Sequence, residues 1–521
     1  MLFLKIIFKF FKKYLFDKIY FKKRKLLLKN LNKSTKNYCL ALFNLILTCL
    51  MKRAVALDVL RGVSIFGMVF SANIPFGILP AWMYHRQTPP PSHVFNPNVP
   101  GITWVDLVLP IFIFCMGVAI PLALNKKIEA GKNFWNIAQS IIKRYFMLVI
   151  FAILIAHFQT SAIPKSFVNF HFLGTYIKKY DLFLITIIGF LSLFSIYVII
   201  ENQQQKKKWR IIGWTAIVSL LLLLHYMYDL KFSLHRSNII ILLLANVYLF
   251  GAFSWYFTRS DKLNRLLLLV IWGAIQITCK TTHFDEALNQ ISGLSWLFLF
   301  RMTHYMLLII PATIVGDIIY QQLTAENSKN TSYSDKKGEK IISHSIFLLG
   351  IWFVVALYNR WLLLLYISTP IVLACFYYLV KKYSPSSLSF FKIAAYMILV
   401  GLILEPAEGG IKKDPVTASY LFITGGISIL WLIFFNYVCQ TNEKSHFVKL
   451  FAGAGSNPLL AYVATNWFII PLMNLTLLII PYQWLYLDGY HWLGVLRAFI
   501  LVFCVMFLVA LATKKKIRWR A

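Results

Sequence analysis

Apolar runs of about twenty residues alternate with short polar loops from Ala54 to the C-terminus. A helix needs about twenty apolar residues to cross a bilayer, so each run predicts a membrane-spanning helix. The runs cover residues 57–75, 102–124, 145–162, 180–200, 209–228, 238–257, 263–279, 296–320, 342–358, 361–380, 390–405, 418–438, 457–480 and 492–513.

This pattern predicts an all-α, polytopic transmembrane helical bundle of about 10–14 spans. The lower counts follow from two interruptions. Only Asn359 and Arg360 separate the runs at 342–358 and 361–380. These two runs form either two helices or one re-entrant element. Pro471 interrupts the run at 457–480. We find no internal repeat of the kind that inverted transporter halves produce.

Residues 1–50 differ from the rest of the chain because they are rich in Lys, Phe and Leu, and their uncharged stretch, 37–50, is too short to span a bilayer. A basic amphipathic anchor and a signal peptide are two interpretations. We favour a third, in which 1–50 is a basic extension upstream of a natural start at Met51. The expected domain is therefore 51–521, with a polar cytoplasmic linker near 322–341.

Lys and Arg concentrate in alternate loops, which orients the bundle by the positive-inside rule. These loops and both termini are expected in the cytoplasm, and the loop after the first helix on the outer side. The basic positions are Lys126, Lys127, Lys132, Lys143, Arg144, residues 206–210, Arg259, Lys262, Arg265, residues 329–340, Lys381, Lys382 and residues 514–520.

Composition changes this picture little. The chain of 521 residues is 59% hydrophobic and carries a formal net charge of +34. Positive-inside topology and anionic lipid account for that charge, so we expect no nucleic-acid partner. The seven cysteines are scattered without a CxxC pair, which favours small core residues over disulfides or metal ligands.

The candidate chemistry lies in residues 53–124, where two apolar helices carry charges. Asp58 and Arg61 stand three residues apart on one helical face. They form either a structural ion pair or a grip for an anionic ligand such as phosphate, from the cytoplasmic side. Ser71 and Asn73 follow near the outer end of this helix, where an asparagine side chain orients a carbonyl or an oxyanion, or is simply solvated.

The loop after this helix contains proline at seven positions from 75 to 100, so it is stiff and not helical. It carries His85 and His93, each a candidate general base or else a solvated loop histidine. The next helix contains Asp106, and Pro110 removes the amide that would bond its carbonyl. Asp106 is expected to cap the helix, to orient a histidine or to make a structural bond.

Other polar residues in apolar segments are expected to line a polar cavity, although His304 is more typical of a satisfied core histidine. They are Arg301, His304, Asp317, Glu405, Glu408 and Asn457.

Four motifs, in order along the chain, resemble a known family. They read RAVALDVLRGVSIFGMVF, PGITWVDLVLPIFIFCMGVAIPLAL, GGIKKDPVTASYLFITGG and AGAGSNPLLAYV. Together they resemble the heparan-α-glucosaminide N-acetyltransferase family, and more closely its bacterial relatives. The resemblance runs from Met51 to the C-terminus and is weakest at 158–290.

The resemblance implies an integral-membrane acetyltransferase of the bacterial inner membrane, with no metal expected. It takes acetyl from cytosolic acetyl-CoA and delivers it to an amino sugar or other glycan acceptor on the outer side. The implied partners are acetyl-CoA, the acceptor, the lipid bilayer and a second copy of the chain in a homodimer. The large lumenal N-terminal domain of the animal enzyme is missing from this sequence, so heparan sulfate is not implied as the acceptor.

The family's active histidine lies in the loop between the two helical motifs and is preceded by an asparagine, here Asn73. Counting from Asn73 favours His85, as does the similarity of YHRQ to the family pattern, whereas counting back from Asp106 favours His93. We lean to His85, acting as a general base or as an acetyl carrier. The expected CoA-binding residues are Asp58, Arg61, Lys143, Arg144 and Asn457.

Two other functions fit the sequence. An integral-membrane O-acyltransferase of envelope polysaccharide would use the same opening motif with an oxygen acceptor. A secondary transporter or flippase would use the helices, the buried charges and the broken helix at Pro471, but it is disfavoured by the missing repeat.

Overall fold

The computed structural model describes residues 55–159, 177–282, 295–297, 302–325, 336–476, 478–484 and 491–519, with positions 284 and 287. The chain divides into two compact units, Met1–Arg53 and Ala54–Ala521. The predicted extension 1–50, Arg301 and residues 326–335 of the predicted linker lie outside the described residues.

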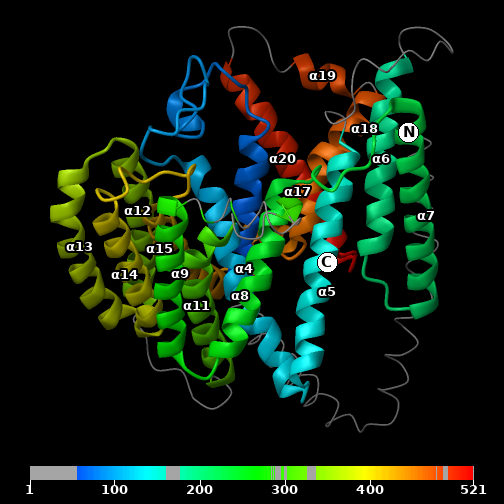
Figure 1. The fold of residues 1–521 in the computed structure, drawn as a ribbon. Coiled ribbons are helices and arrows are strands. Elements are labelled where there is room, and N and C mark those ends of the chain that lie inside the picture. The colour runs from blue at the N-terminus through cyan, green and yellow to red at the C-terminus, as the bar shows by residue number, and fades with distance from the viewer. Residues whose placement is uncertain are drawn as a thin grey trace. The chain divides into compact units, whose positions relative to one another are not determined.

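The second unit is built from helices (Figure 1), and the described residues contain no strand beyond an isolated bridge between Val198 and Trp519. A helix at 55–71 comes first. It is followed by η1 (Ala81–Met83), α4 (Trp104–Glu129), α5 (Phe134–His157), α6 (Ile177–Tyr197), α7 (Gln203–Tyr228), α8 (Ile239–Thr258), α9 (Lys262–Thr282), η4 (Ser295–Leu297), η5 (Thr303–Tyr305), α11 (Met306–Ala325), α12 (Lys336–Tyr358), α13 (Leu362–Tyr383), η7 (Pro385–Ser387), α14 (Leu388–Leu404), α15 (Ala418–Thr441), α16 (His446–Gly455), α17 (Pro458–Ala464), η8 (Thr465–Ile469), α18 (Ile470–Leu475), α19 (Ile479–Trp484) and α20 (His491–Lys514).

Within the described residues, twelve helices are long and apolar enough to cross a membrane. The prediction of an all-α polytopic bundle is therefore confirmed, and the protein is an integral membrane protein. Asn359 and Arg360 join two full-length helices, α12 and α13, with Arg360 in the left-handed conformation at φ 60°. Two spans, not one re-entrant element, occupy this region.

Several predicted boundaries are wrong; the run expected at 145–162, for example, is the helix α5 at Phe134–His157. The run expected at 296–320 begins in a separate 3-10 turn, η4, and the span itself starts at Thr303. The run expected at 457–480 ends at Leu475 and includes a π-helical turn, η8, shortly before Pro471. Hydropathy alone does not separate an apolar turn from the helix beside it, and proline removes one helical hydrogen bond.

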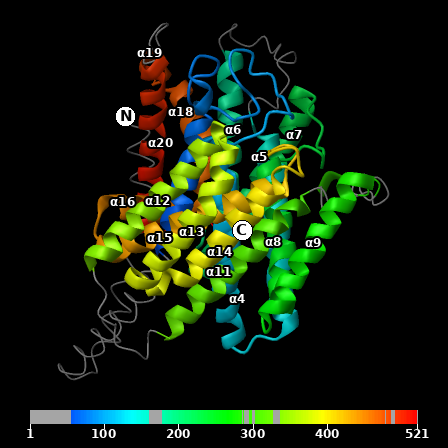
Figure 2. The ribbon, with the colours of Figure 1, turned by 90° about the vertical axis from the view of Figure 1, so that its left-hand side faces the viewer.

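The interior of the unit is organised around α4, which packs along α11 and also contacts α8 and α15. Figure 2 shows this group from a second side, with α14 and α15 among the helices that surround it. The loop predicted on the outer side lies with two further loops at one end of the group. Gly101 N–H donates to the Ile411 carbonyl at 2.9 Å, and Arg360 pairs with Glu405. These contacts join loops 72–103, 359–361 and 405–417.

The helix at 55–71 meets α16 at direct backbone contact. A Cβ atom added to Gly62 would lie 2.1 Å from the Phe451 carbonyl oxygen, and one added to Gly455 would lie 1.9 Å from the Asp58 carbonyl oxygen. Neighbouring helices approach this closely only where a side chain is missing. The glycines of the first and last sequence motifs therefore form one helix crossing.

We predict that Gly62→Ala and Gly455→Ala each destabilise the protein by about 1–3 kcal/mol, because the new methyl group has no space. Gly273→Ala on α9 is the matched control, since a Cβ there meets no atom within 4 Å. Thermal unfolding of the purified protein in detergent measures the difference. Equal unfolding temperatures of the three variants would contradict the close backbone contact at Gly62 and Gly455.

Candidate active site

The start of α4 is built around the carboxylate of Asp106, whose side chain is only 2% exposed. Thr103 is the N-cap of this helix, and its N–H donates to Asp106 Oδ2 at 3.0 Å in a capping box. The Arg86 N–H donates to the same oxygen at 3.1 Å, and the Thr103 hydroxyl lies 3.1 Å away. The carboxylate is thus fixed from the helix and from the preceding loop.

The backbone carbonyl of Asp106 is also bonded, although Pro110 removes its ordinary helical partner. The Tyr420 hydroxyl, on α15, donates to this carbonyl at 2.6 Å. A buried carbonyl without a hydrogen-bond donor costs free energy, and the Tyr420 hydroxyl replaces the donor that Pro110 removes. The bond ties the start of α15 to the start of α4.

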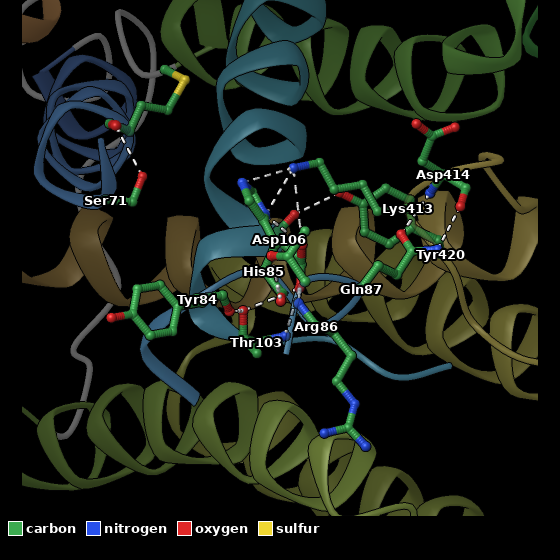
Figure 3. A network of polar contacts seen from close by, with 12 residues as sticks. Ser71, Tyr84, His85, Arg86, Gln87, Thr103, Asp106, Lys413, Asp414 and Tyr420 are labelled. Atoms are coloured by element: carbon green, nitrogen blue, oxygen red, sulfur yellow. Dashed lines mark hydrogen bonds and ion pairs between the residues drawn. The ribbon is translucent and has the colours of Figure 1, made fainter. Parts of the chain in front are cut away.

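His85 lies against this carboxylate, with Nδ1 2.8 Å from Asp106 Oδ1 (Figure 3). An ionised carboxylate only accepts hydrogen bonds, so Nδ1 carries the proton and a neutral ring keeps its lone pair on Nε2. The side chain is 42% exposed, which leaves Nε2 accessible. This is the arrangement of a general base with an orienting acid.

The loop before His85 is locked by Tyr84. Its hydroxyl donates to the Pro75 carbonyl at 2.7 Å and accepts from the Leu79 N–H at 3.0 Å. The carbonyl of Tyr84 in turn accepts from the Thr103 hydroxyl at 2.8 Å. The predicted stiffness of this loop therefore has a side-chain cause as well as its prolines.

Lys413 completes the cluster from the loop between α14 and α15. Its Nζ lies 2.9 Å from His85 Nδ1, 3.3 Å from His85 Nε2 and 3.9 Å from Asp106 Oδ1. Burial lowers the pKa of Lys413 from its ordinary value, against the opposing charges of Asp106 and Asp414. A lysine, a histidine and a carboxylate thus share one small volume.

Gln87 holds the Lys413 loop in place. Its Oε1 accepts from the Asp414 N–H at 2.9 Å, and its Nε2 donates to the Asp414 carbonyl (Figure 3). The same Nε2 also lies 3.3 Å from the Pro97 carbonyl. This buried amide therefore pairs with the backbone of the residue next to Lys413, as a neighbouring strand would.

His93, the other candidate, has no place in this cluster. Its ring lies between Phe76 and Tyr84, with centroids 4.3 and 4.6 Å away, and its backbone is left-handed at φ 50°. Both ring nitrogens are buried without a hydrogen-bond partner. The geometry separates the two histidines, which spacing alone left open.

Asn73 and Ser71 bond to their own helix end. Asn73 Nδ2 donates to the Val69 carbonyl at 2.7 Å, and Ser71 Oγ donates to the Met68 carbonyl at 3.0 Å. Neither has a hydrogen bond to His85, Asp106 or Lys413. The role of Asn73 beside a reacting carbonyl stays a prediction.

Asp58 and Arg61 form the predicted ion pair, at 3.0 Å. Arg61 also donates to the Gly455 carbonyl at 3.2 Å and to the Cys115 carbonyl at 3.4 Å. Its guanidinium therefore links the first helix to α16 and α4. Binding of CoA by this pair stays a prediction.

Asn457, also expected at the CoA site, bonds the C-terminal segment. Its Nδ2 donates to the Ile517 carbonyl and its Oδ1 accepts from the Trp519 N–H, both at 3.0 Å. Lys143 is exposed on α5, while the guanidinium of Arg144 stacks on Tyr248, 4.4 Å from the ring centroid. These residues do not meet Asp58 and Arg61 in one hydrogen-bonded group.

The remaining predicted polar residues lie in separate places. Asp317 pairs with Arg265 and accepts from Trp255 at 3.0 Å, beside a cavity of about 230 Å³ at the far end of α4. Glu405 binds Arg360 and Tyr366, while Glu408 accepts from the first amides of α15. No group of three His, Cys, Asp or Glu within the described ranges is placed to hold a metal ion.

Sequence reasoning did not single out Lys413 or Gln87. Lys413 stands in the motif GGIKKDPVTASYLFITGG, which carries the family resemblance, so a signal was present. The sequence contains no signal for Gln87, because a single glutamine in a polar loop belongs to no recognisable pattern. Both act through contacts between residues more than three hundred positions apart.

Comparison with known proteins gives a family without an assigned activity. Residues 53–319 match the family described as a domain of unknown function, DUF5009. No curated protein matches the chain. The match includes His85 and Asp106 and stops before Lys413.

We predict that Gln87→Leu loosens the loop that carries Lys413, because the Asp414 peptide loses both partners at a cost of about 1–3 kcal/mol. The expected result is a lower unfolding temperature and faster tryptic cleavage after Lys412 or Lys413. Gln204→Leu, at an exposed position of α7, is the control. Unchanged cleavage and stability in Gln87→Leu would show that the pairing is unimportant.

Proposed function

The chain belongs to the DUF5009 family, and we propose that it is a membrane-embedded acetyltransferase in which His85 is the general base. The donor is cytosolic acetyl-CoA, and the acceptor is an amino sugar or other glycan on the outer side. A bacterial inner membrane is the proposed location. The heparan-α-glucosaminide N-acetyltransferase resemblance of the four motifs supports this donor and this direction.

One observation carries the proposal, namely the 2.8 Å bond between His85 Nδ1 and the buried Asp106 carboxylate. It commits Nδ1 and leaves Nε2, which lies 3.3 Å from Lys413 Nζ, as the base. A carboxylate in this position also stabilises the imidazolium that forms when the ring accepts a proton. His157 differs from His85, because both of its ring nitrogens are engaged by backbone groups of Ile153 and Ser233.

The proposed step conserves atoms and charge. The acceptor amine or hydroxyl gives its proton to His85 Nε2 as its lone pair attacks the thioester carbon. The tetrahedral intermediate then collapses, the carbon–sulfur bond breaks, and the imidazolium returns its proton to the thiolate of CoA. In the alternative order, Nε2 itself attacks the thioester carbon and the carbon–sulfur bond breaks to release CoA. The acceptor then attacks the acetyl-imidazole and gives up its proton as the carbon–nitrogen bond to Nε2 breaks.

The position of the site supports transfer between two compartments. His85, Asp106 and Lys413 lie where the loop predicted on the outer side meets two further loops, and the basic ends of α4 and α12 lie at other loops. An acceptor outside the cytoplasm reaches the exposed face of His85 from this end. The acetyl group comes from the opposite side through the bundle.

We predict that His85→Ala lowers acetyl-CoA turnover by about 10²- to 10⁴-fold, the contribution typical of a positioned general base. Turnover is measured as free CoA released from labelled acetyl-CoA by membrane vesicles that retain their envelope glycans. His93→Phe, which keeps the ring between Phe76 and Tyr84, is the matched control and should stay active. A fully active His85→Ala variant would refute the role of His85.

Asp106→Asn is a second test of the same site. The amide can donate to Nδ1, which forces the proton onto Nε2 and removes the base, so a loss of up to about 10⁴-fold is expected. Thermal unfolding checks that α4 still forms. A transporter or flippase would leave acetyl-CoA intact in every variant, and mass spectrometry of the acetylated glycan distinguishes amide from ester products.

A further inference from the structure

The amine of Lys413 lies over the face of the His85 ring. The two nitrogens of an imidazole point away from each other in the ring plane, so no donor is in line with both. Nζ is nevertheless 2.9 Å from Nδ1 and 3.3 Å from Nε2. Because Nδ1 is already bonded to Asp106, the amine keeps hydrogens for another acceptor.

We propose that Lys413 is a second catalytic residue, whose ammonium stabilises the oxyanion formed when the acyl thioester is attacked. This inference rests on the proposed function. It adds a residue from the loop between α14 and α15, outside the matched family region, to the base in the loop before α4.

The geometry places the ammonium next to the reacting atoms. An acceptor atom hydrogen-bonded to Nε2 lies in reach of Nζ, because Nζ and Nε2 are only 3.3 Å apart. The attacked carbonyl carbon is bonded to that acceptor atom in the intermediate. Its oxygen gains the electron pair of the carbon–oxygen π bond, and an N–H of Lys413 donates to it. Collapse returns the pair as the thiolate leaves.

The charges around Lys413 come from three segments. Asp106 on α4 lies 3.9 Å from Nζ of Lys413, and Asp414 follows Lys413 in the loop. His85, in the loop before α4, lies 2.9 Å from Nζ through Nδ1. Tyr420 on α15 engages the Asp106 carbonyl, and Arg86 points away from the cluster toward Tyr358 (Figure 3). The two carboxylates oppose the effect of burial, which lowers the pKa of the amine.

Two features hold the ammonium in this position. Gln87 pairs with both backbone groups of Asp414, and Gly101 N–H bonds the Ile411 carbonyl, so the loop is fixed on either side of Lys413. A Cβ atom on Gly410 would lie 2.4 Å from Pro100 Cβ, which shows how closely the two loops meet. Preorganised donors of this kind lower a barrier without rearranging during the reaction.

The test uses the full chain in proteoliposomes with labelled acetyl-CoA outside and envelope glycan inside. Lys413→Met should lower turnover by about 10²- to 10³-fold, as removal of an oxyanion donor does. Lys413→Arg keeps a permanent charge and should recover a substantial part of that loss. Lys412→Met, the neighbouring lysine, is the control and should match the unaltered protein.

The pH dependence of turnover distinguishes a catalytic role of Lys413 from a purely structural role. The protonated lysine is the active form and burial lowers its pKa, so turnover should fall with rising pH before the ordinary lysine value of about 10.4 is reached. Lys413→Arg should lose this alkaline decline, because arginine stays protonated. Thermal unfolding of each variant reports whether it is folded.

The outcomes separate the two proposals. If the folded Lys413→Met variant keeps full activity while His85→Ala has none, the role of Lys413 is wrong and the base is not. If Lys413→Arg is as inactive as Lys413→Met, a base and not a cation is required at this position, which also overturns the inference. If the unaltered protein releases no CoA, the proposed function fails and this role fails with it.

Discussion

The burial of the Asp106 carboxylate is the constraint on which the site depends. An ionised carboxylate inside a protein is stable only when donors replace the water it has lost. Here the donors are Thr103 from the start of α4, Arg86 and His85 from the preceding loop, and Lys413 at longer range. Those groups belong to three segments, so satisfying one charge brings the three segments together.

This constraint also determines the chemistry available. The carboxylate accepts the hydrogen bond from Nδ1 of His85, and the Lys413 amine lies near the same carboxylate. Nε2 of His85 and the hydrogens of the amine are not used in that bond. A base and an amine held this close together suit the acyl transfer proposed for this site. His93 lacks any such partner and is held by two aromatic rings, so it contributes to the shape of the loop.

Local patterns in the sequence predicted the features that depend on local physics. The helices follow from apolar runs, and the Asp58–Arg61 ion pair follows from a spacing of three residues. The choice between His85 and His93 does not follow, because it depends on the left-handed backbone of His93 and on the position of Asp106. Lys413 and His85 are 328 positions apart, and no periodicity reports a contact of that kind.

The direction in which the Asp106 side chain points depends on the rotation of α4 about its axis. Three backbone carbonyls of this helix accept hydrogen bonds from side chains of other helices. Ser64 donates to Val108, Tyr420 to Asp106, and Arg61 to Cys115. Only the Asp106 carbonyl loses its helical partner to Pro110, but each of the three bonds restricts rotation of the helix. The first helix and α15 therefore clamp α4 from different directions. Successive residues of an α-helix are about 100° apart around its axis, so a rotation of α4 by one residue would move the carboxylate out of reach of His85. The polar bonds to the α4 backbone therefore support the geometry of the proposed site as well as the fold.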